Sequence, residues 1–208
     1  MAAWLESDYT GSMAKQAERR AATREAILTA ARRLFGTRGF AVTTVDEIAE
    51  GAGVAKGAVY HHFKTKEAVF EAVFDDVSRD LVAEIDSAAR AEKDVLAAMV
   101  AGTQHYFAAT AKGPTGQIIL RDGPAVLGWE RWREIDARHF GGKLPRAVAA
   151  AMEAGLIARQ PVEPLARLLL GAVTEAAVAC AGRADIARAG TEYARAFRSL
   201  VEALRLRA

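Results

Sequence analysis

The chain is poor in the residues that build disulfide-linked, metal-bound or membrane-embedded proteins. Its 208 residues contain one cysteine, Cys180, so no disulfide can form within the chain and no zinc-ligand pair exists. No run of eighteen apolar residues occurs, and the N-terminus lacks the apolar core of a signal peptide. We therefore expect a cytoplasmic protein with no membrane span, no metal site and no cofactor.

Proline is also scarce, with five residues, and no alternating apolar and polar run is long enough to predict a strand. Apolar residues instead recur with helical spacing, and Gly or Pro separates the helical segments. The sequence thus predicts an all-α protein. The expected helices cover residues 17–38, two short segments within 43–66, 66–91, 94–111, a short region around 123–124, 129–155 with an interruption at 141–142, 164–183 and 185–207.

The net charge of +2 is small, but its distribution is uneven. Between Met13 and Lys66, ten Lys or Arg stand against five Asp or Glu, a local charge of +5. This excess favours a nucleic-acid partner for the N-terminal part of the chain. The first basic residues of this region fit either a solvated helix start or an arm that contacts phosphates; they are Lys15, Arg19, Arg20 and Arg24.

The segment TTVDEIAEGAGVAKGAVYHHFKTK, residues 43–66, has the pattern of two short helices joined by a glycine turn. Thr44 and Glu47 have the spacing of a capping box at the start of the first helix. Gly53 stands where the chain leaves that helix, a position that favours positive φ. The apolar residues fall on the inner edges of the two helices and predict one small shared core: Ile48, Ala49, Ala52, Val54, Val59 and Phe63.

The other face of the second helix is basic, aromatic and small. Lys56 and Tyr60 are four residues apart and share a face, while Gly57 and Ala58 allow close approach to base edges. Flanking lysines suit phosphates. This pattern predicts a DNA-binding helix-turn-helix, the alternative being an ordinary helical hairpin with a solvated face. The residues expected to contact DNA are Thr44, Lys56, Gly57, Ala58, Tyr60, His61 and Lys66.

The run from Ile27 to Phe70 resembles the N-terminal domain of TetR-family transcriptional regulators, a match that covers less than a third of the chain. The residues that carry the resemblance are Ala31, Leu34, Phe35, Gly39, Phe40, Thr44, Ile48, Ala49, Ala52, Gly53, Val54, Gly57, Tyr60, Phe63 and Lys66. The resemblance implies a homodimeric, ligand-responsive repressor whose second motif helix enters the major groove of a palindromic operator.

On this basis we expect three parts along the chain. Residues 1–12 are a disordered extension or a cloning remnant, residues 13–66 form the three-helix DNA-binding domain with its helix-turn-helix, and residues 67–208 form a larger helical ligand-binding and dimerisation domain. The last two helices carry long apolar stripes that serve either a four-helix dimer interface or the core of the monomer itself. The residues assigned to the interface are Leu169, Val173, Ala176, Tyr193, Phe197 and Leu200.

Aromatic and polar residues gather around the Gly-Pro breaks of the second half and could line a small-molecule pocket or fill the core. The residues assigned to this pocket are Gln104, His105, Tyr106, Arg121, Trp129 and Trp132. Arg121 and Arg131 could pair with an anionic ligand, but Asp122, Glu130 and Glu134 could neutralise them. The polarity of the ligand therefore stays open.

No catalytic constellation is present in the sequence. The GAGVAKG run lacks the spacing of a phosphate-binding loop, and His61 and His62 point about 100° apart on a helix. The leading interpretation is a repressor released from its operator by a small-molecule effector. A constitutive or architectural DNA-binding protein is the alternative, and an all-helical enzyme is a remote one.

Overall fold

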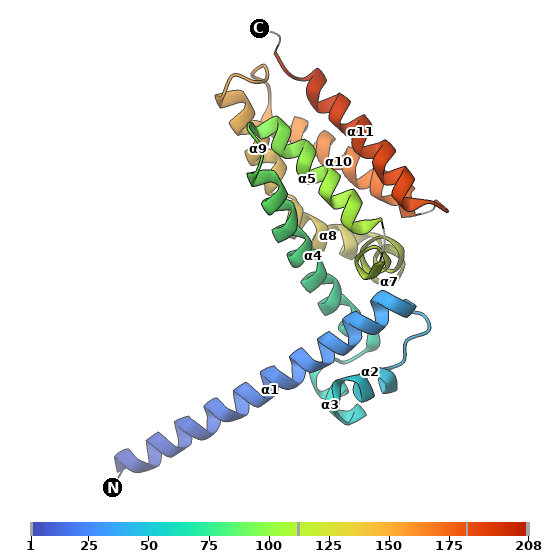
Figure 1. Cartoon of the computed structure of the whole chain (residues 1–208). Helices are drawn as coiled ribbons and strands as arrows, with labels where there is room; N and C mark the ends of the chain where they lie inside the picture. The colour runs from blue at the N-terminus through green and yellow to red at the C-terminus, as the bar shows by residue number, and fades with distance from the viewer. Residues whose placement is uncertain (1, 112, 182, 207–208) are drawn as a thin grey trace. The chain divides into compact units, whose positions relative to one another are not determined.

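The computed structural model describes residues 2–111, 113–181 and 183–206, with side chains from Lys15 onward, and in this part of the chain no strand forms (Figure 1). The chain divides into two compact units, Met1–Val73 and Phe74–Ala208. The all-α prediction is confirmed.

The first unit contains α1 (Ala2–Arg38), α2 (Val45–Ala52), α3 (Lys56–His62) and the start of α4 (Lys66–Arg90). Its core joins buried residues of α1, such as Ile27 and Phe35, to the inner edges of α2 and α3. The rings of Phe35, Phe40 and Phe70 meet pairwise, with centroids 5.3 to 5.6 Å apart. Such edge-on aromatic contacts add to the burial energy that holds the short helices against α1.

Helix α1 begins at Ala2, well before the expected start near residue 17. It ends at Arg38 as predicted, where Gly39 adopts a φ of 85°. The prediction that residues 1–12 are a disordered extension or a cloning remnant falls on residues whose side chains lie outside the described part of the structure.

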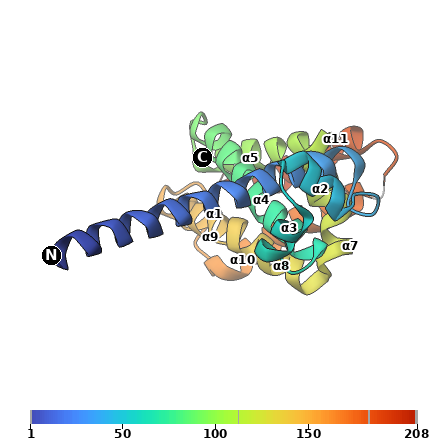
Figure 2. The same cartoon turned by 90° about the horizontal axis from the view of Figure 1, so that it is seen from below.

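The second unit is a layered helical bundle, with α5 packed against α11 and α10 packed against α9. In the view of Figure 2, α5 and α11 lie toward one side and α8 and α10 toward the other. After α4, its elements are α5 (Val95–Thr110), α6 (Gly113–Gly116), η1 (Gln117–Asp122), α7 (Gly123–Leu127), α8 (Trp129–Phe140), α9 (Lys143–Glu153), α10 (Val162–Ala181) and α11 (Ile186–Ala203).

The apolar stripes of α10 and α11 are largely used within the chain itself. Leu169 and Phe197 lie in the core cluster with Leu96, and Val173 packs against that cluster. Ala176 is buried, and Tyr193 stacks on Phe107 with ring centroids 6.5 Å apart. Of the six residues assigned to a dimer interface, Leu200 alone is exposed, at 48%. The other five are at least partly covered within the chain itself: Leu169, Ala176 and Phe197 are buried, and Val173 and Tyr193 are half-buried. Their assignment to a dimer interface stays a prediction.

Helix α10 is the one described helix that is long and apolar enough to cross a membrane, by length and composition alone. A helix from the core of a bundle passes the same test. Six of its residues are buried, among them Leu165 and Cys180. Packing within this unit accounts for only part of its apolar character, because other apolar residues, among them Leu168 and Val178, are exposed.

The segment η1 is a π-helix, which the sequence pattern does not predict. Its residues Ile118, Ile119 and Leu120 are all buried. Gly123 follows directly, and a Cβ atom there would lie 2.7 Å from the ring of Phe74. A π-helical turn changes the helical phase locally, and here three consecutive residues of such a turn are buried.

Candidate nucleic-acid interface and effector cavity

The start of α2 is fixed by a reciprocal capping box. The Thr44 hydroxyl accepts a hydrogen bond from the Glu47 N–H at 3.2 Å, and the Glu47 carboxylate accepts one from the Thr44 N–H at 2.9 Å. Arg38 adds an ion pair to the same carboxylate at 2.6 Å. The backbone hydrogen bond from Thr44 and the contact with Arg38 lower the pKa of Glu47 to about 2. The predicted capping box is confirmed, and it leaves the Thr44 hydroxyl engaged within α2.

The turn between α2 and α3 is closed by backbone hydrogen bonds around Gly53. Gly53 has a φ of 66°, in the left-handed region, and its N–H donates to the Glu50 carbonyl at 3.0 Å. The N–H of Val54 donates to the Ala49 carbonyl, also at 3.0 Å. This pattern satisfies the last carbonyls of α2 and turns the chain at once into α3.

Helix α3 presents the expected outer face. Lys56, Gly57 and His61 are exposed, and Tyr60 is 44% exposed, whereas Val59 is buried against the rest of the unit. Ala58 is half-buried. The predicted helical phase is therefore confirmed. The outer face of α3 does not pack into the core of the unit.

Lys56 is held by a carboxylate on the neighbouring helix. Its ammonium lies 2.9 Å from the Asp46 carboxylate, and this hydrogen bond raises the pKa of Lys56. Both side chains are more than half exposed, so water and salt weaken the pair. Lys56 can exchange Asp46 for a phosphate or a base without leaving a buried charge behind.

Lys66 has a different place from the one predicted. Its ammonium donates hydrogen bonds to the Phe40 and Thr43 carbonyls, both at 2.9 Å, and lies over the Phe40 ring. The side chain is half-buried and ties the start of α4 to the loop between α1 and α2. We therefore assign Lys66 to the architecture of the unit rather than to DNA contact.

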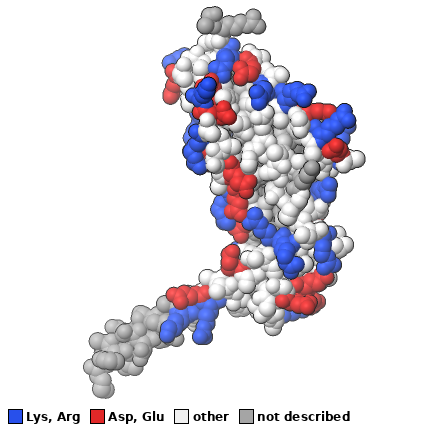
Figure 3. Space-filling view, in the orientation of Figure 1, with Lys and Arg blue, Asp and Glu red and all other residues white. Residues whose placement is uncertain are grey.

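Basic residues of α1 lie beside the end of α3. The Arg24 guanidinium is 5.3 Å from the centroid of the Phe63 ring. Burial, together with the charges of His61, Arg20 and Arg24, lowers the pKa of His62. Lys15, Arg19, Arg20 and Arg24 are all exposed, and Figure 3 shows Lys and Arg side chains on α1 next to the grey residues. These side chains extend the basic surface beyond α3.

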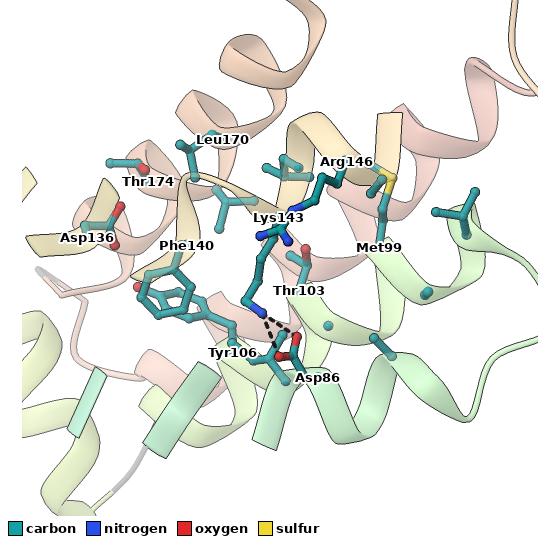
Figure 4. A pocket seen from close by; sticks show the side chains of 18 of the residues that line it. Asp86, Met99, Thr103, Tyr106, Asp136, Phe140, Lys143, Arg146, Leu170 and Thr174 are labelled. Carbon is teal, nitrogen blue, oxygen red and sulfur yellow. Dashed lines mark hydrogen bonds and ion pairs between the residues drawn. The ribbon is translucent and has the colours of Figure 1, made fainter. Parts of the chain in front are cut away.

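The second unit contains a cavity of about 360 Å³ that is lined by α4, α5, α8, α9 and α10 and is partly open to solvent (Figure 4). Its lining is mostly apolar, with side chains such as Met99, Phe140, Leu144 and Leu170. This volume falls within the range of small-molecule sites, which combine apolar walls with a few polar groups. The sequence predicts a pocket in this half of the chain, but it does not predict which helices line it.

The polar groups of the cavity lie in two places. Near the middle of the view in Figure 4, the Lys143 ammonium forms an ion pair with the Asp86 carboxylate, at 2.6 Å to each oxygen. At the other end lies Asp136, and burial raises the pKa of its carboxyl to about 6. Burial, with Asp136 nearby, also raises the pKa of Tyr106.

Two of the six residues predicted for a pocket, Tyr106 and Trp132, line this cavity. Gln104 lines a second pocket, between α5 and α11. The other three line neither space: His105 lies 3.0 Å from Glu84, Arg121 donates to Gln117, and Trp129 is 49% exposed. Chemistry and nearness in sequence predict these three residues for a pocket, but neither fixes the direction in which a helical side chain points.

Sequence reasoning missed most of the polar lining. The polar side chains of the cavity that were not predicted are Asp86, Thr103, Asp136, Lys143, Arg146 and Thr174. Asp136 could have been found, because it is four residues after Trp132 and therefore on the same face of a helix. The others come from helices whose packing partners the sequence does not reveal.

Comparison with known proteins identifies both units. Residues 27–73 match the model of "Bacterial regulatory proteins, tetR family", and residues 96–204 match the model "Tetracyclin repressor-like, C-terminal domain". The second match alone covers more than half of the chain. The chain belongs to the TetR family.

Individual relatives of this TetR-family protein agree with that result. The Transposon Tn10 TetC protein of Escherichia coli is 25% identical over 159 residues, which are 75% of this chain and 79% of that protein. The HTH-type transcriptional repressor KstR2 of Mycolicibacterium smegmatis is 45% identical over 56 residues, or 27% of each chain.

A solved structure extends the likeness to nearly the whole chain. A TetR-family transcriptional regulator from Pectobacterium atrosepticum has a TM-score of 0.81 and 25% identity, covering 91% of this chain and 97% of that one. This TetR-family protein is therefore a DNA-binding transcriptional regulator, and its helix-turn-helix is formed by α2 and α3.

Proposed function

We propose that this TetR-family protein is a cytoplasmic, homodimeric repressor that a small molecule releases from a palindromic operator. The observation that carries the proposal is the outer face of α3, where Lys56, Tyr60 and His61 are exposed on a helix whose other face is buried. A helix of this kind fits the major groove, where side chains near its N-terminus contact base edges.

The residues expected to contact DNA fall into two groups, those that reach bases and those that contact the sugar-phosphate backbone. Tyr60 and Lys56 have the reach to contact bases, and Gly57 and Ala58 allow the helix to approach them closely. We expect His61 and Thr44 to contact the sugar-phosphate backbone, the Thr44 hydroxyl then donating to a phosphate in place of the Glu47 carboxylate. Lys15, Arg19, Arg20, Arg24 and Lys64 are exposed cations that suit phosphates.

A dimer requires an exposed apolar surface, and α10 carries one. Leu168 is 73% exposed, and Gly171, Ala172, Glu175 and Val178 follow on the same face, all exposed, so the face is apolar except at Glu175. On α11, Leu200 continues such a surface. Small residues let two helices approach closely, so we propose that α10 and α11 of two copies pack around a two-fold axis.

The effector side of the proposal rests on the cavity. The space is mostly apolar, carries a few polar groups and has a volume of about 360 Å³, which is typical of small-molecule sites. A ligand that binds there adds contacts only in the conformation that holds it, and so can shift the regulator between two states. The cavity favours this reading over a constitutive DNA-binding protein.

Selection of bound duplexes from random DNA tests the proposal directly. We expect a palindrome with half-sites about one helical turn apart, because a two-fold dimer presents two α3 helices to one face of the duplex. A single non-repeated site, or no enrichment, would contradict the dimeric operator reading.

Salt dependence tests the assignment of the basic residues. The logarithm of the operator affinity should fall with the logarithm of the salt concentration, with a slope of about −0.9 for each phosphate contact. Arg24→Gln should reduce the slope by about one unit. Lys93→Gln, an exposed cation of the second unit, serves as the matched control and should leave the slope unchanged.

The dimer surface is tested by Leu168→Glu, with mass measured by light scattering after gel filtration. A charge on this exposed position should give a monomer that keeps its helical content, since Leu168 contributes little to the chain's own core. Arg167→Glu, on the neighbouring face, is the control. A dimer that persists in Leu168→Glu would place the interface elsewhere.

A further inference from the structure

Resting on the proposed ligand response, we infer that the cavity of the second unit binds an apolar molecule that carries one protonated amine, with its ammonium group against Asp136. The inference comes from a contrast within the cavity lining. The carboxylate of Asp136 has no partner, whereas the cationic side chains of the lining are either paired or exposed.

Asp136 faces the cavity because of its position on α8. Trp132, Asp136 and Phe140 follow one another at intervals of four residues, and all three line the cavity. Arg133 and Ala137, which come next around the helix, are exposed and do not line it. Both carboxylate oxygens of Asp136 keep accessible surface, since neither is among the fully buried polar atoms that lack a partner. A ligand in the cavity can therefore reach this carboxylate.

The Asp136 carboxylate has no partner of its own. Among the residues that the structure describes, no hydrogen bond or ion pair reaches it, and Arg133 and His139 act on it only through their charges. His139 lies 2.9 Å from Asp75 instead, and the Arg133 guanidinium lies over the Trp129 ring. Burial raises the pKa of Asp136 to about 6, so its carboxyl is ionised at pH 7.5 although it has lost much of its water. A cation in the cavity would replace that water with an ion pair.

The cationic side chains of the lining are less suited to an anionic ligand. The Lys143 ammonium lies 2.6 Å from each oxygen of Asp86, so a ligand carboxylate would have to displace Asp86. Arg146 is exposed, and its Nε donates to the Gly142 carbonyl at 2.7 Å. In the view of Figure 4, Arg146 and Asp136 lie toward opposite ends of the cavity. The charge that is left for a ligand is therefore the negative one of Asp136.

The surroundings of Asp136 also suit an ammonium group, which has three donors and no acceptor. The hydroxyls of Tyr106 and Thr174 line the same cavity and can accept hydrogen bonds, and Thr174 lies at the Asp136 end in Figure 4. The rings of Tyr106 and Phe140 have centroids 6.0 Å apart, and aromatic faces attract cations. Apolar side chains such as Leu170 would hold the body of the molecule.

Three matched probes test the inference by isothermal titration calorimetry on the full-length protein at pH 7.5. They share a propylphenyl group and differ at one end: para-propylbenzylamine is a cation, para-propylbenzyl alcohol is neutral and para-propylbenzoate is an anion. We expect the amine to bind about tenfold to a hundredfold more tightly than the alcohol, because hydrogen bonds between charged groups are stronger than neutral ones. The benzoate should bind most weakly, since it would stand beside a like charge.

Asp136→Asn tests the contact itself, because it removes the charge and keeps the shape of the side chain. It should lower the affinity for the amine by about tenfold or more and leave the affinity for the alcohol within about threefold. Asp136→Ser gives the same comparison if Asp136→Asn does not fold. Glu130→Gln is the matched control, since Glu130 is an exposed carboxylate of the same helix that does not line the cavity. It should leave the affinity for the amine within about twofold.

Several outcomes would overturn the inference. Tightest binding of the benzoate would assign the polar contact to Lys143 or Arg146, and equal affinities for amine and alcohol would leave Asp136 without a role. Equal losses for both probes in Asp136→Asn would mean a damaged cavity, and an equal loss of amine affinity in Glu130→Gln would mean an effect of net charge alone. No binding of any probe would also contradict it.

Operator affinity, measured by fluorescence anisotropy with and without the amine, separates this inference from the proposed function. An amine that binds as expected and weakens operator binding supports both. An amine that binds as expected but leaves operator affinity unchanged supports the assigned contact and contradicts the proposed release from DNA.

Discussion

The Lys66 ammonium lies 4.1 Å from the centre of the Phe40 ring and donates hydrogen bonds to the carbonyls of Phe40 and Thr43. One side chain thereby joins the first turn of α4 to the loop between α1 and α2. The contact combines a cation–π interaction with two charge-assisted hydrogen bonds at a half-buried position.

Lys66→Met should therefore lower the free energy of unfolding of the first unit by about 1–3 kcal/mol, because it leaves two carbonyls without their donor. Urea denaturation of the full chain, followed by circular dichroism, measures the change. Lys64→Met, at an exposed position two residues earlier, should have almost no effect on stability. Equal stability of the two variants would show that the Lys66 contacts contribute nothing.

Gly53→Ala and Gly57→Ala should change stability in opposite directions. Neither glycine has a neighbour within 4 Å of an added Cβ, so packing does not decide the outcome. Gly53 has a φ of 66°, where an L-residue is strained, and Gly53→Ala should lose about 1 kcal/mol. Gly57 lies within α3, and Gly57→Ala should gain up to about 1 kcal/mol. Thermal melts of the two variants provide the comparison; a gain for Gly53→Ala would contradict the turn geometry.

Tyr60→Ala should lower specific operator affinity by about tenfold or more without unfolding the protein, because the side chain is on the outer face of α3. Fluorescence anisotropy with labelled operator measures the affinity, and a thermal melt monitors the fold. Trp129→Ala removes an aromatic side chain of similar exposure from the second unit and should leave DNA affinity unchanged. An unfolded Tyr60→Ala variant would place Tyr60 in the core instead.

Asp136→Asn should stabilise the protein near neutral pH and lose that advantage in acid. The folded-state pKa of Asp136 is raised from 3.8 to about 6, so the native state binds more protons than the unfolded chain between these values. The free energy of unfolding therefore falls as the pH rises from the lower pKa to the higher one, and the full loss caused by the ionised Asp136 is present above pH 6. At pH 7.5 the variant should gain about 1–3 kcal/mol.

Melts of Asp136→Asn and the unaltered chain at a series of pH values follow the difference. The two curves should converge near pH 4, where Asp136 is protonated in the folded protein. Asp75→Asn, a partly exposed aspartate that pairs with Arg138 and His139, should instead lower stability at neutral pH. A constant difference across the whole series for Asp136→Asn would show that its effect is steric.

The helix-turn-helix was predictable because its determinants are local. Thr44, Glu47 and Gly53 act within one or two turns of the chain, and the spacing of Val59 and Phe63 fixes the helical phase of the buried edge. The contacts of Lys66 were not predictable in this way, because the carbonyls that accept its hydrogen bonds are 23 and 26 residues away in sequence. A lysine beside a basic motif is indistinguishable from a phosphate ligand until the loop it reaches is known.

The second unit was predictable in its helices but not in its surfaces. Periodicity identifies the apolar stripe of α10, yet Leu169 faces the core of its own chain and Leu168 faces outward, one residue apart. Which face meets which neighbour depends on the packing of α5, α9 and α11. The cavity depends on the same packing, so Lys143 and Asp86 were not linked to Tyr106 by sequence alone.

The absence of a side chain at Gly123 allows close packing behind Trp132, one residue of the cavity wall. A Cβ there would stand 2.7 Å from the Phe74 ring on α4, 3.2 Å from the Trp132 indole and 3.1 Å from the Ile118 carbonyl of the π-helix. These three groups close on one backbone position with no flexible atoms between them. A molecule that pushes the indole outward must therefore displace α4 or the π-helix as well, because densely packed groups transmit strain instead of absorbing it.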